Sequence, residues 1–271
     1  MSGFYRGTWR STALLLAAAA ACRPAADTAR VSDTRRLMGV PWTITLHAPT
    51  DAAGREALTA AFAEVARIEG ILSDYDPASE LSRLSAAAPT TQPVPVGPDL
   101  WRVLERAVAF RDASDGAFDP TVGPLTTLWR QARRSGRLPR PDKLAAALAA
   151  VGPRALELVV DSRAVRLPRP GTRLDLGGIG MGYASDRVLE VLRGRGIEAA
   201  LIDASGDVAA AGPPPGAPPA GAVPRAIPRS PAGPPCRAGA APRPRRCLPV
   251  GRARAAFRPW DQPRMAVMAA A

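Results

Sequence analysis

Three short stretches of the chain carry residue types that could bind a ligand or a metal ion. The first, residues 72–84, combines hydroxyls and carboxylates with one aromatic ring, that of Tyr75. The second, residues 115–125, adds further carboxylates and a Thr hydroxyl, and the third, residues 174–186, places four glycines in six positions. Carboxylates suit cations, whereas closely spaced glycines suit an anion held by the backbone. These stretches therefore contain the candidate site.

The glycine-rich segment Gly177–Gly182 favours phosphate binding. Glycines let a backbone approach a ligand closely, and the sequence from Tyr183 onward predicts a helix that follows directly. A turn at the start of a helix directs N–H groups at an anion. The segment is neither a Walker A loop nor a dinucleotide-binding fingerprint. Taken alone, such a segment is more often only a tight turn.

Other candidate residues also have simpler interpretations. Tyr75 fits a plain surface turn, and Asp119 before Pro120 fits a turn or a helix cap. Asp186 fits a surface charge on its helix. His47 is the only histidine, and it alternates with Thr45 on an expected strand, which favours a structural role over that of a base.

The spacing of apolar residues predicts the elements that must position these stretches. Residues 42–47 alternate as a strand does, whereas residues 58–72 and 100–108 step by three and four, as helices do. Further elements are expected as a hairpin over 158–167, a helix over 183–192, and strands over 200–202 and 208–210. The predicted class is α+β, with a mixed sheet and packed helices.

The N-terminus predicts export. Arg6 and Arg10 precede the apolar run Ala13–Ala21, which is too short to span a bilayer. Small residues directly before Cys22 resemble a bacterial lipoprotein cleavage box, in which Cys22 is lipidated. An ordinary signal peptide is the alternative. We therefore expect a protein of the cell envelope, lipid-anchored to the membrane and facing the periplasm.

The net charge of +12 does not indicate nucleic-acid binding. Residues 213–271 hold ten Arg and one Asp, so most of the charge lies in a segment that also carries 15 of the 30 prolines. That composition predicts disorder rather than a folded basic surface with stacking aromatics. The expected organisation is a signal peptide over 1–21, a tether over 22–36, an enzyme-like domain over 37–212 and a disordered tail over 213–271.

Together, the three stretches resemble the ApbE family, the FAD:protein FMN transferases. The resemblance runs from about Leu37 to Gly212. Its markers are Met38-Gly39, Ser79-Glu80-Leu81, Gly116-Ala117-Phe118-Asp119-Pro120-Thr121, Asp175-Leu176-Gly177-Gly178-Ile179, Gly182-Tyr183-Ala184, Asp186 and Gly206-Asp207.

The resemblance implies an ApbE-like fold, related to the T-fold, and a defined activity. FMN would pass from FAD to a Thr or Ser of an acceptor flavoprotein, such as a subunit of a redox complex, with release of AMP. It implies Mg²⁺ as the metal, with Gly178 as a backbone ligand. It also implies FAD contacts at Met38, Tyr75, Ala117, Phe118, Asp119, Asp175 and Met181.

The sequence departs from the family in ways that keep alternatives open. Met181 stands where the family often has a charged residue. After Gly212 we find no counterpart of the segments that carry the family's metal-binding carboxylate and hydroxyl, and the Arg/Pro/Ala/Gly string is typical of a GC-rich gene read in a shifted frame. We therefore expect an ApbE-type domain whose C-terminal part is missing. The alternatives are a catalytically inactive flavin-binding or interaction lipoprotein and an FAD hydrolase.

Overall fold

The computed structural model describes residues 28–217, and those as far as Pro215 form one compact unit with an α+β fold. The predictions about Cys22, the signal segment and residues 218–271 lie outside the described residues. The elements, in chain order, are β1 (Ala29–Leu37), β2 (Val40–Ala48), α2 (Asp51–Leu72), α3 (Glu80–Ala86), β3 (Val94–Pro95), α4 (Pro98–Ala113), α5 (Gly123–Ser135), α6 (Pro141–Ala149), β4 (Glu157–Val159), β5 (Ala164–Arg166), α7 (Gly177–Gly194), β6 (Ala199–Ala204) and β7 (Asp207–Ala211).

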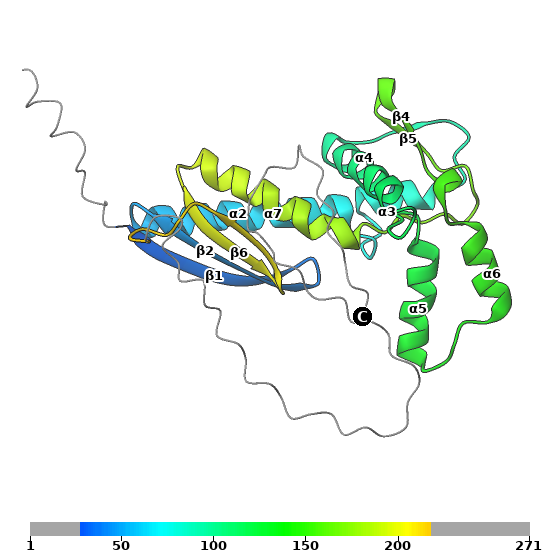
Figure 1. The fold of residues 1–271 in the computed structure, drawn as a ribbon, viewed down its shortest axis with the longest axis horizontal. Coiled ribbons are helices and arrows are strands. Elements are labelled where there is room, and N and C mark those ends of the chain that lie inside the picture. Colours follow the sequence, from blue (N-terminus) through cyan, green and yellow to red (C-terminus); the bar gives the residue numbers. More distant parts are fainter. Residues whose placement is uncertain (1–27, 218–271) are drawn as a thin grey trace, which may run out of the picture. The chain divides into compact units, whose positions relative to one another are not determined.

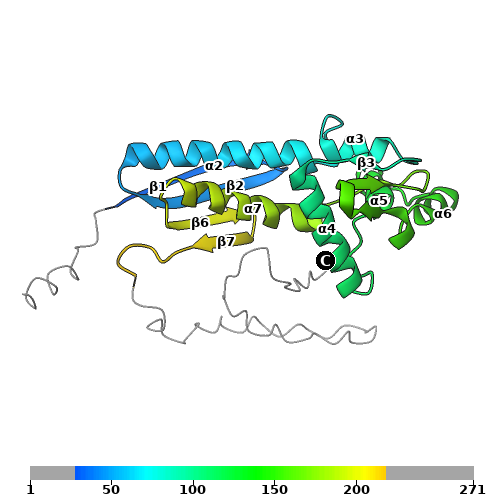
Figure 2. The same cartoon turned by 90° about the horizontal axis from the view of Figure 1, so that it is seen from above.

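The main sheet has the strand order β1-β2-β6-β7, and all its ladders are antiparallel. Its strands alternate between two faces, as the period of two requires. Trp42, Ile44 and Leu46 are fully buried on the inner face, where Ile44 pairs with Ile202 of β6. Helices α2 and α7 lie side by side along this face of the sheet (Figure 1, Figure 2). The sheet and these two helices therefore enclose the main hydrophobic core.

The outer face of the sheet is largely polar. Thr45 and Thr43 of β2 exchange hydroxyl hydrogen bonds with Ser32 and Thr34 of β1, at 2.8 and 2.9 Å. Cross-strand pairs of this kind stabilise an exposed sheet face. Among the large apolar residues of β6 and β7, Leu201 and Val208 are exposed.

Helix α2 follows from its sequence. The Thr50 hydroxyl accepts the Ala53 N–H at 3.2 Å and caps the first turn. Leu58, Phe62 and Val65 then face the core at helical spacing. These residues confirm the helix that the sequence predicts over 58–72.

A network of charged side chains joins α2, α4 and α7. Arg67 of α2 donates to Glu64 at 2.8 Å and to Asp99 of α4 at 2.7 Å. Tyr183 of α7 donates its hydroxyl to Asp99, and Arg187 contacts Glu64 at 3.2 Å. Although burial opposes ionisation, the hydrogen bonds from Arg67 and Tyr183 hold the pKa of Asp99 below its usual range. The network fixes α7 against the other two helices.

Two sequence predictions are corrected here. The expected tether over 22–36 is wrong from Ala29 onward, because residues 29–37 form β1 and pair with β2 along its full length. The glycines of 177–182 do not form a turn that precedes the helix, because α7 already begins at Gly177. Met38 and Gly39 form the two-residue turn between β1 and β2, and both have positive φ, which matches the twist of a hairpin.

The remaining predictions of local structure are confirmed. Strands β4 and β5 pair antiparallel as the expected hairpin, within a second sheet of order β3-β5-β4. Strands β6 and β7 pair through the turn at Ser205-Gly206. Throughout residues 28–217 the ladders between strands are antiparallel, and the one parallel contact is an isolated bridge between Val122 and Arg173. In this part of the chain, no helix is both long and apolar enough to cross a membrane.

The pKa of Asp186 on α7 generates a prediction about stability. Burial raises this pKa to about 6, and the carboxylates of Glu190 and Asp207 add to the effect, whereas Arg193 opposes it. Between the unfolded pKa near 3.8 and the folded pKa, the native chain holds more protons than the unfolded chain. The contribution of Asp186 to the free energy of unfolding therefore declines as pH rises from about 4 to about 6.

Urea unfolding of the wild type and of Asp186→Asn at pH 4, 5, 6 and 7.5 measures this decline. We expect Asp186→Asn to lose that part of the pH dependence and to gain relative stability above pH 6. Glu190→Gln should move the decline to lower pH, because it removes one neighbouring negative charge. Parallel pH profiles for the wild type and Asp186→Asn would contradict the assignment.

Candidate functional site

A cavity of about 480 Å³ lies at the N-terminal end of α7. It is formed by the turn between β1 and β2, the end of α2 with the segment that follows it, one residue of α5 and the first turn of α7. Concave sites of this size, with a few convergent polar groups, are the usual binding sites of small ligands. The residues that line it are Met38, Gly39, Val40, Glu69, Leu72, Ser73, Asp74, Tyr75, Arg130, Leu176, Gly177, Gly180 and Met181.

Three of the residues predicted to contact FAD line this cavity together. Met38 stands on the hairpin turn with φ +49°, a conformation that residues with a side chain seldom adopt. Tyr75 lies on the segment after α2 and is 72% exposed. Met181 lies on the first turns of α7. Segments up to 143 residues apart in sequence thus meet at one opening, which the sequence order alone does not show.

The start of α7 brings glycines to the edge of the cavity. The N–H of Gly177 donates to Oδ1 of Asp175 at 2.9 Å, and the Leu176 carbonyl accepts the N–H groups of Ile179 and Gly180. A Cβ at Gly180 would stand 3.6 Å from both Leu72 and Met38, which is ordinary van der Waals contact, so a methyl group would fit there but would cover part of the helix backbone. The predicted metal ligand, Gly178, is exposed on this turn. The positive end of the helix dipole and a bare backbone therefore meet at the cavity.

Arg130 of α5 is the cation among the side chains that line the cavity. It donates one Nη to Asp74 and the other to Asp175, at 3.1 Å in the second case. Its guanidinium carbon lies 4.3 Å from the ring centroid of Tyr75. Burial disfavours its charge, but the hydrogen bond and charge of Asp74 and the charge of Asp175 hold the pKa of Arg130 above its usual range.

Four other residues predicted to contact FAD are not among the residues that line the cavity: Ala117, Phe118, Asp119 and Asp175. Asp119 Oδ1 accepts both the N–H and the hydroxyl of Thr121, at 2.8 and 2.6 Å, so its side chain stabilises a local turn. Phe118 packs edge-to-face against Phe110, with ring centroids 6.4 Å apart. Ala117, Phe118 and Asp119 belong to residues 117–122, which we call the supporting segment.

The supporting segment binds the backbone of residues 173–175, which lead into α7. The Pro120 carbonyl accepts the Asp175 N–H at 2.8 Å, and Val122 bridges Arg173. At Gly123, a Cβ would stand 2.5 Å from the carbonyl oxygen of Arg173, which leaves no room for a side chain. The segment therefore aligns α5, and with it Arg130, against Asp175.

Sequence reasoning missed Arg130, Asp74 and Glu69 as cavity residues. Asp74 and Glu69 lie within or beside the first stretch, so their residue type was a usable signal. Arg130 lies five residues beyond the second stretch, and no local pattern distinguishes it from the many other arginines. Only the position of α5 relative to Asp175 identifies it.

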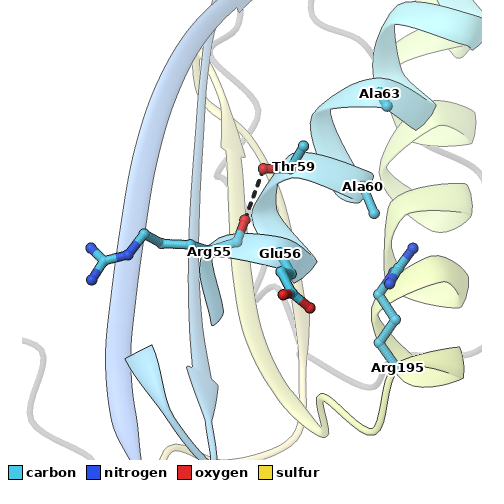
Figure 3. A pocket seen from close by; sticks show the side chains of 6 residues that line it. All are labelled: Arg55, Glu56, Thr59, Ala60, Ala63 and Arg195. Carbon is cyan, nitrogen blue, oxygen red and sulfur yellow. Dashed lines mark hydrogen bonds between the residues drawn. The ribbon is translucent and has the colours of Figure 1, made fainter. Parts of the chain in front are cut away.

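A second, wider depression of about 530 Å³ lies beside α2 and Arg195 (Figure 3). Ala60 and Ala63 line it, and the Thr59 hydroxyl donates a hydrogen bond to the Arg55 carbonyl at 2.9 Å. Figure 3 shows Arg55 pointing away from Arg195, on the other side of α2. The depression lacks the convergent polar groups of a binding site.

The described residues do not supply a complete metal site. Between Thr28 and Ala217, no group of three or more His, Cys, Asp or Glu side chains could hold a metal ion. Hard cations such as Mg²⁺ need several oxygen ligands, and the Gly178 carbonyl would contribute one. These residues alone therefore do not fit a bound Mg²⁺.

Comparison with solved structures identifies the fold as that of ApbE flavin transferases. The ApbE protein of Thermotoga maritima superimposes with a TM-score of 0.62 at 27% identity, over 69% of this chain and 60% of that chain. The flavin transferase ApbE of Vibrio cholerae gives a TM-score of 0.61 at 24% identity, over 68% of this chain and 60% of that chain. The expected α+β, ApbE-like fold is thus confirmed.

Sequence comparison identifies the family. The ApbE family matches residues 38–226, so this chain belongs to the ApbE family. A FAD:protein FMN transferase of Treponema pallidum (strain Nichols) is 34% identical over 161 residues, 58% of this chain and 44% of the relative. One of Klebsiella pneumoniae (strain 342) is 32% identical over 172 residues, 64% of this chain and 53% of the relative. The chain spans about half the length of these curated relatives.

The close approach at Gly123 can be tested by stability. Gly123→Ala should lower the free energy of unfolding by about 1–3 kcal/mol, because the added Cβ overlaps the Arg173 backbone. Gly70→Ala is the matched control, since a Cβ at Gly70 of α2 meets open space and should stabilise the helix by up to about 1 kcal/mol. Denaturant unfolding measures both variants. Equal effects at the two glycines would show that the supporting segment is not tightly packed.

Proposed function

We propose that this protein transfers FMN from FAD to a Thr or Ser of an acceptor protein, with release of AMP. One observation carries the proposal: the family match covers the described cavity, which is lined both by an exposed tyrosine and by the N-terminal end of a glycine-rich helix. The relatives that match are FAD:protein FMN transferases. The acceptor would be a flavoprotein such as a subunit of a redox complex.

The cavity residues suit the two ends of FAD. The exposed ring of Tyr75 offers a stacking surface to the flavin, and such stacking contributes about 1–3 kcal/mol for a planar base. The backbone at Gly177 and Gly180 lets the diphosphate approach the positive end of α7. Glu69 and Asp74 line the same cavity and oppose a bound anion, so positive charge is needed there.

The transfer is a substitution at phosphorus, of the phosphoryl-transfer type. The hydroxyl oxygen of the acceptor forms a new bond to the phosphorus of the FMN portion. The bond from that phosphorus to the bridging oxygen breaks, and AMP leaves with its electron pair while the hydroxyl proton is released. The chain's contribution is to hold the flavin and the diphosphate in line with the acceptor.

Mg²⁺ dependence is a proposal that rests on the resemblance to the family. A metal on the diphosphate would neutralise its charge. Because residues 28–217 do not supply a fitting ligand set, we assign the metal no step. The same finding favours a second candidate function, which is flavin binding without transfer. FAD hydrolysis would follow if water took the place of the acceptor hydroxyl.

We propose a lipid-anchored protein of the cell envelope that faces the periplasm, because the apolar run Ala13–Ala21 ends directly before Cys22. Exported acceptor flavoproteins would share that compartment.

The assignment of Tyr75 predicts a loss of FAD affinity. Tyr75→Ala should raise the Kd for FAD by about 5- to 150-fold, because the stacking surface is lost. Tyr75→Phe keeps the ring and should bind FAD nearly as the wild type does. Flavin fluorescence titration measures both, and mass spectrometry of a Thr-bearing acceptor peptide measures transfer.

The outcomes separate the candidate functions. A peptide that gains the mass of FMN supports transfer, whereas FAD binding without a mass gain supports the second candidate. If Tyr75→Ala and the wild type bind FAD equally, Tyr75 does not contact the flavin.

A further inference from the structure

Arg130 reaches the cavity from a helix that otherwise lies outside it. It is the one residue of α5 that lines the cavity, two turns beyond the point where Gly123 packs on Arg173. Its guanidinium contacts three groups at once: the carboxylates of Asp74 and Asp175 and the ring of Tyr75. These groups come from the segment after α2 and from the entry of α7. One side chain of α5 therefore connects two separate parts of the site.

The geometry of these contacts restrains Arg130 firmly. A guanidinium is a rigid planar fork, so two hydrogen bonds to different carboxylates fix both its position and its plane. The carboxylates are mostly buried, with side-chain exposures of 17% for Asp74 and 9% for Asp175. Screening by water is weak at such positions, and charge-assisted hydrogen bonds are correspondingly strong.

Tyr75, by contrast, has little else to hold its ring. Tyr75 is 72% exposed, and the hydrogen bond found at this residue joins its backbone N–H to the Ser73 hydroxyl at 3.2 Å. The guanidinium, 4.3 Å from the ring centroid, is within the range of a cation–π contact. The plane of Arg130 thus restrains the ring of Tyr75 at the mouth of the cavity.

We propose that Arg130 is a positioning residue for flavin binding. It acts through Tyr75, by holding the ring in the orientation that stacks on the flavin, and it links that ring through Asp175 to the first N–H of α7. The proposal rests on the proposed function, because it assumes that the cavity takes a flavin. Preorganisation of this kind raises affinity because the ring is already ordered before the ligand arrives.

Two roles of Arg130 must be separated, because its charge could also attract the diphosphate directly. Riboflavin carries the same ring system without phosphate, so it reports only on the ring-binding end of the cavity. A role through Tyr75 must further depend on the presence of the Tyr75 ring. A double-mutant cycle between the two residues, measured with riboflavin, isolates this dependence.

The experiment measures riboflavin and FAD binding by fluorescence for the full chain and for Arg130→Met, Tyr75→Ala and the double variant. Arg130→Met should weaken riboflavin binding about two- to fivefold, as expected for loss of a cation–π restraint. In the Tyr75→Ala background, the same change should have no further effect on riboflavin. Arg130→Lys should give an intermediate loss, since it keeps the cation but not the fork. Arg140→Met, at an exposed arginine paired with Asp142, is the control and should bind as the wild type does.

Circular dichroism before each titration confirms that the variants are folded. If Arg130→Met does not fold, Arg130→Lys takes its place in the cycle. Equal losses in the presence and absence of Tyr75, or no loss of riboflavin affinity, would overturn the proposal. A loss confined to FAD would also overturn it and would assign Arg130 to the diphosphate. If the wild type binds neither flavin, the proposed function itself fails. Flavin binding with no coupling between Arg130 and Tyr75 leaves that function intact and rejects only the positioning role.

Discussion

The site depends on the hydrogen bonds made by the buried carboxylate of Asp175. One oxygen accepts the first N–H of α7 at 2.9 Å, and the other accepts from Arg130 at 3.1 Å. The Asp175 N–H donates to Pro120, so the backbone is fixed as well. A carboxylate with 9% exposure would be costly to bury without such partners. Asp175 therefore joins the start of α7 to helix α5. Through Arg130 it is also linked to the segment that bears Tyr75.

The rest of the fold keeps α7 in the place that Asp175 defines. Ile179, Tyr183 and Val188 bury one face of the helix, and the hydroxyl of Tyr183 binds Asp99 of α4. Helix α2 packs beside α7 on the same face of the sheet (Figure 2). Its last turn contributes Glu69 and Leu72 to the lining of the cavity. A helix that is anchored on its buried face, and whose first N–H is bound by Asp175, keeps the positive end of its dipole at a fixed point. That end of α7 lines the cavity.

The sequence predicts the elements whose hydrophobic period is strong, and it predicts less where the cause is tertiary. Helix α2 and the β4–β5 hairpin follow from local spacing. Strand β1 was missed because Val31 is its one buried residue, so its pairing with β2 rather than burial defines it. The start of α7 was missed because glycine disfavours helices, a preference that the Asp175 cap and tertiary packing override. Arg130 has no local signal, since its partners lie 45 and 56 residues away.

The central claim is that the cavity beside Asp175 binds the flavin of FAD. A crystal structure of the full chain grown with FAD tests it most directly. The account predicts electron density for the flavin ring against Tyr75 and for the diphosphate near Gly177 and Gly180, with Arg130 still bound to Asp175. FAD bound elsewhere, or a chain that leaves this cavity empty at saturating FAD, would contradict it.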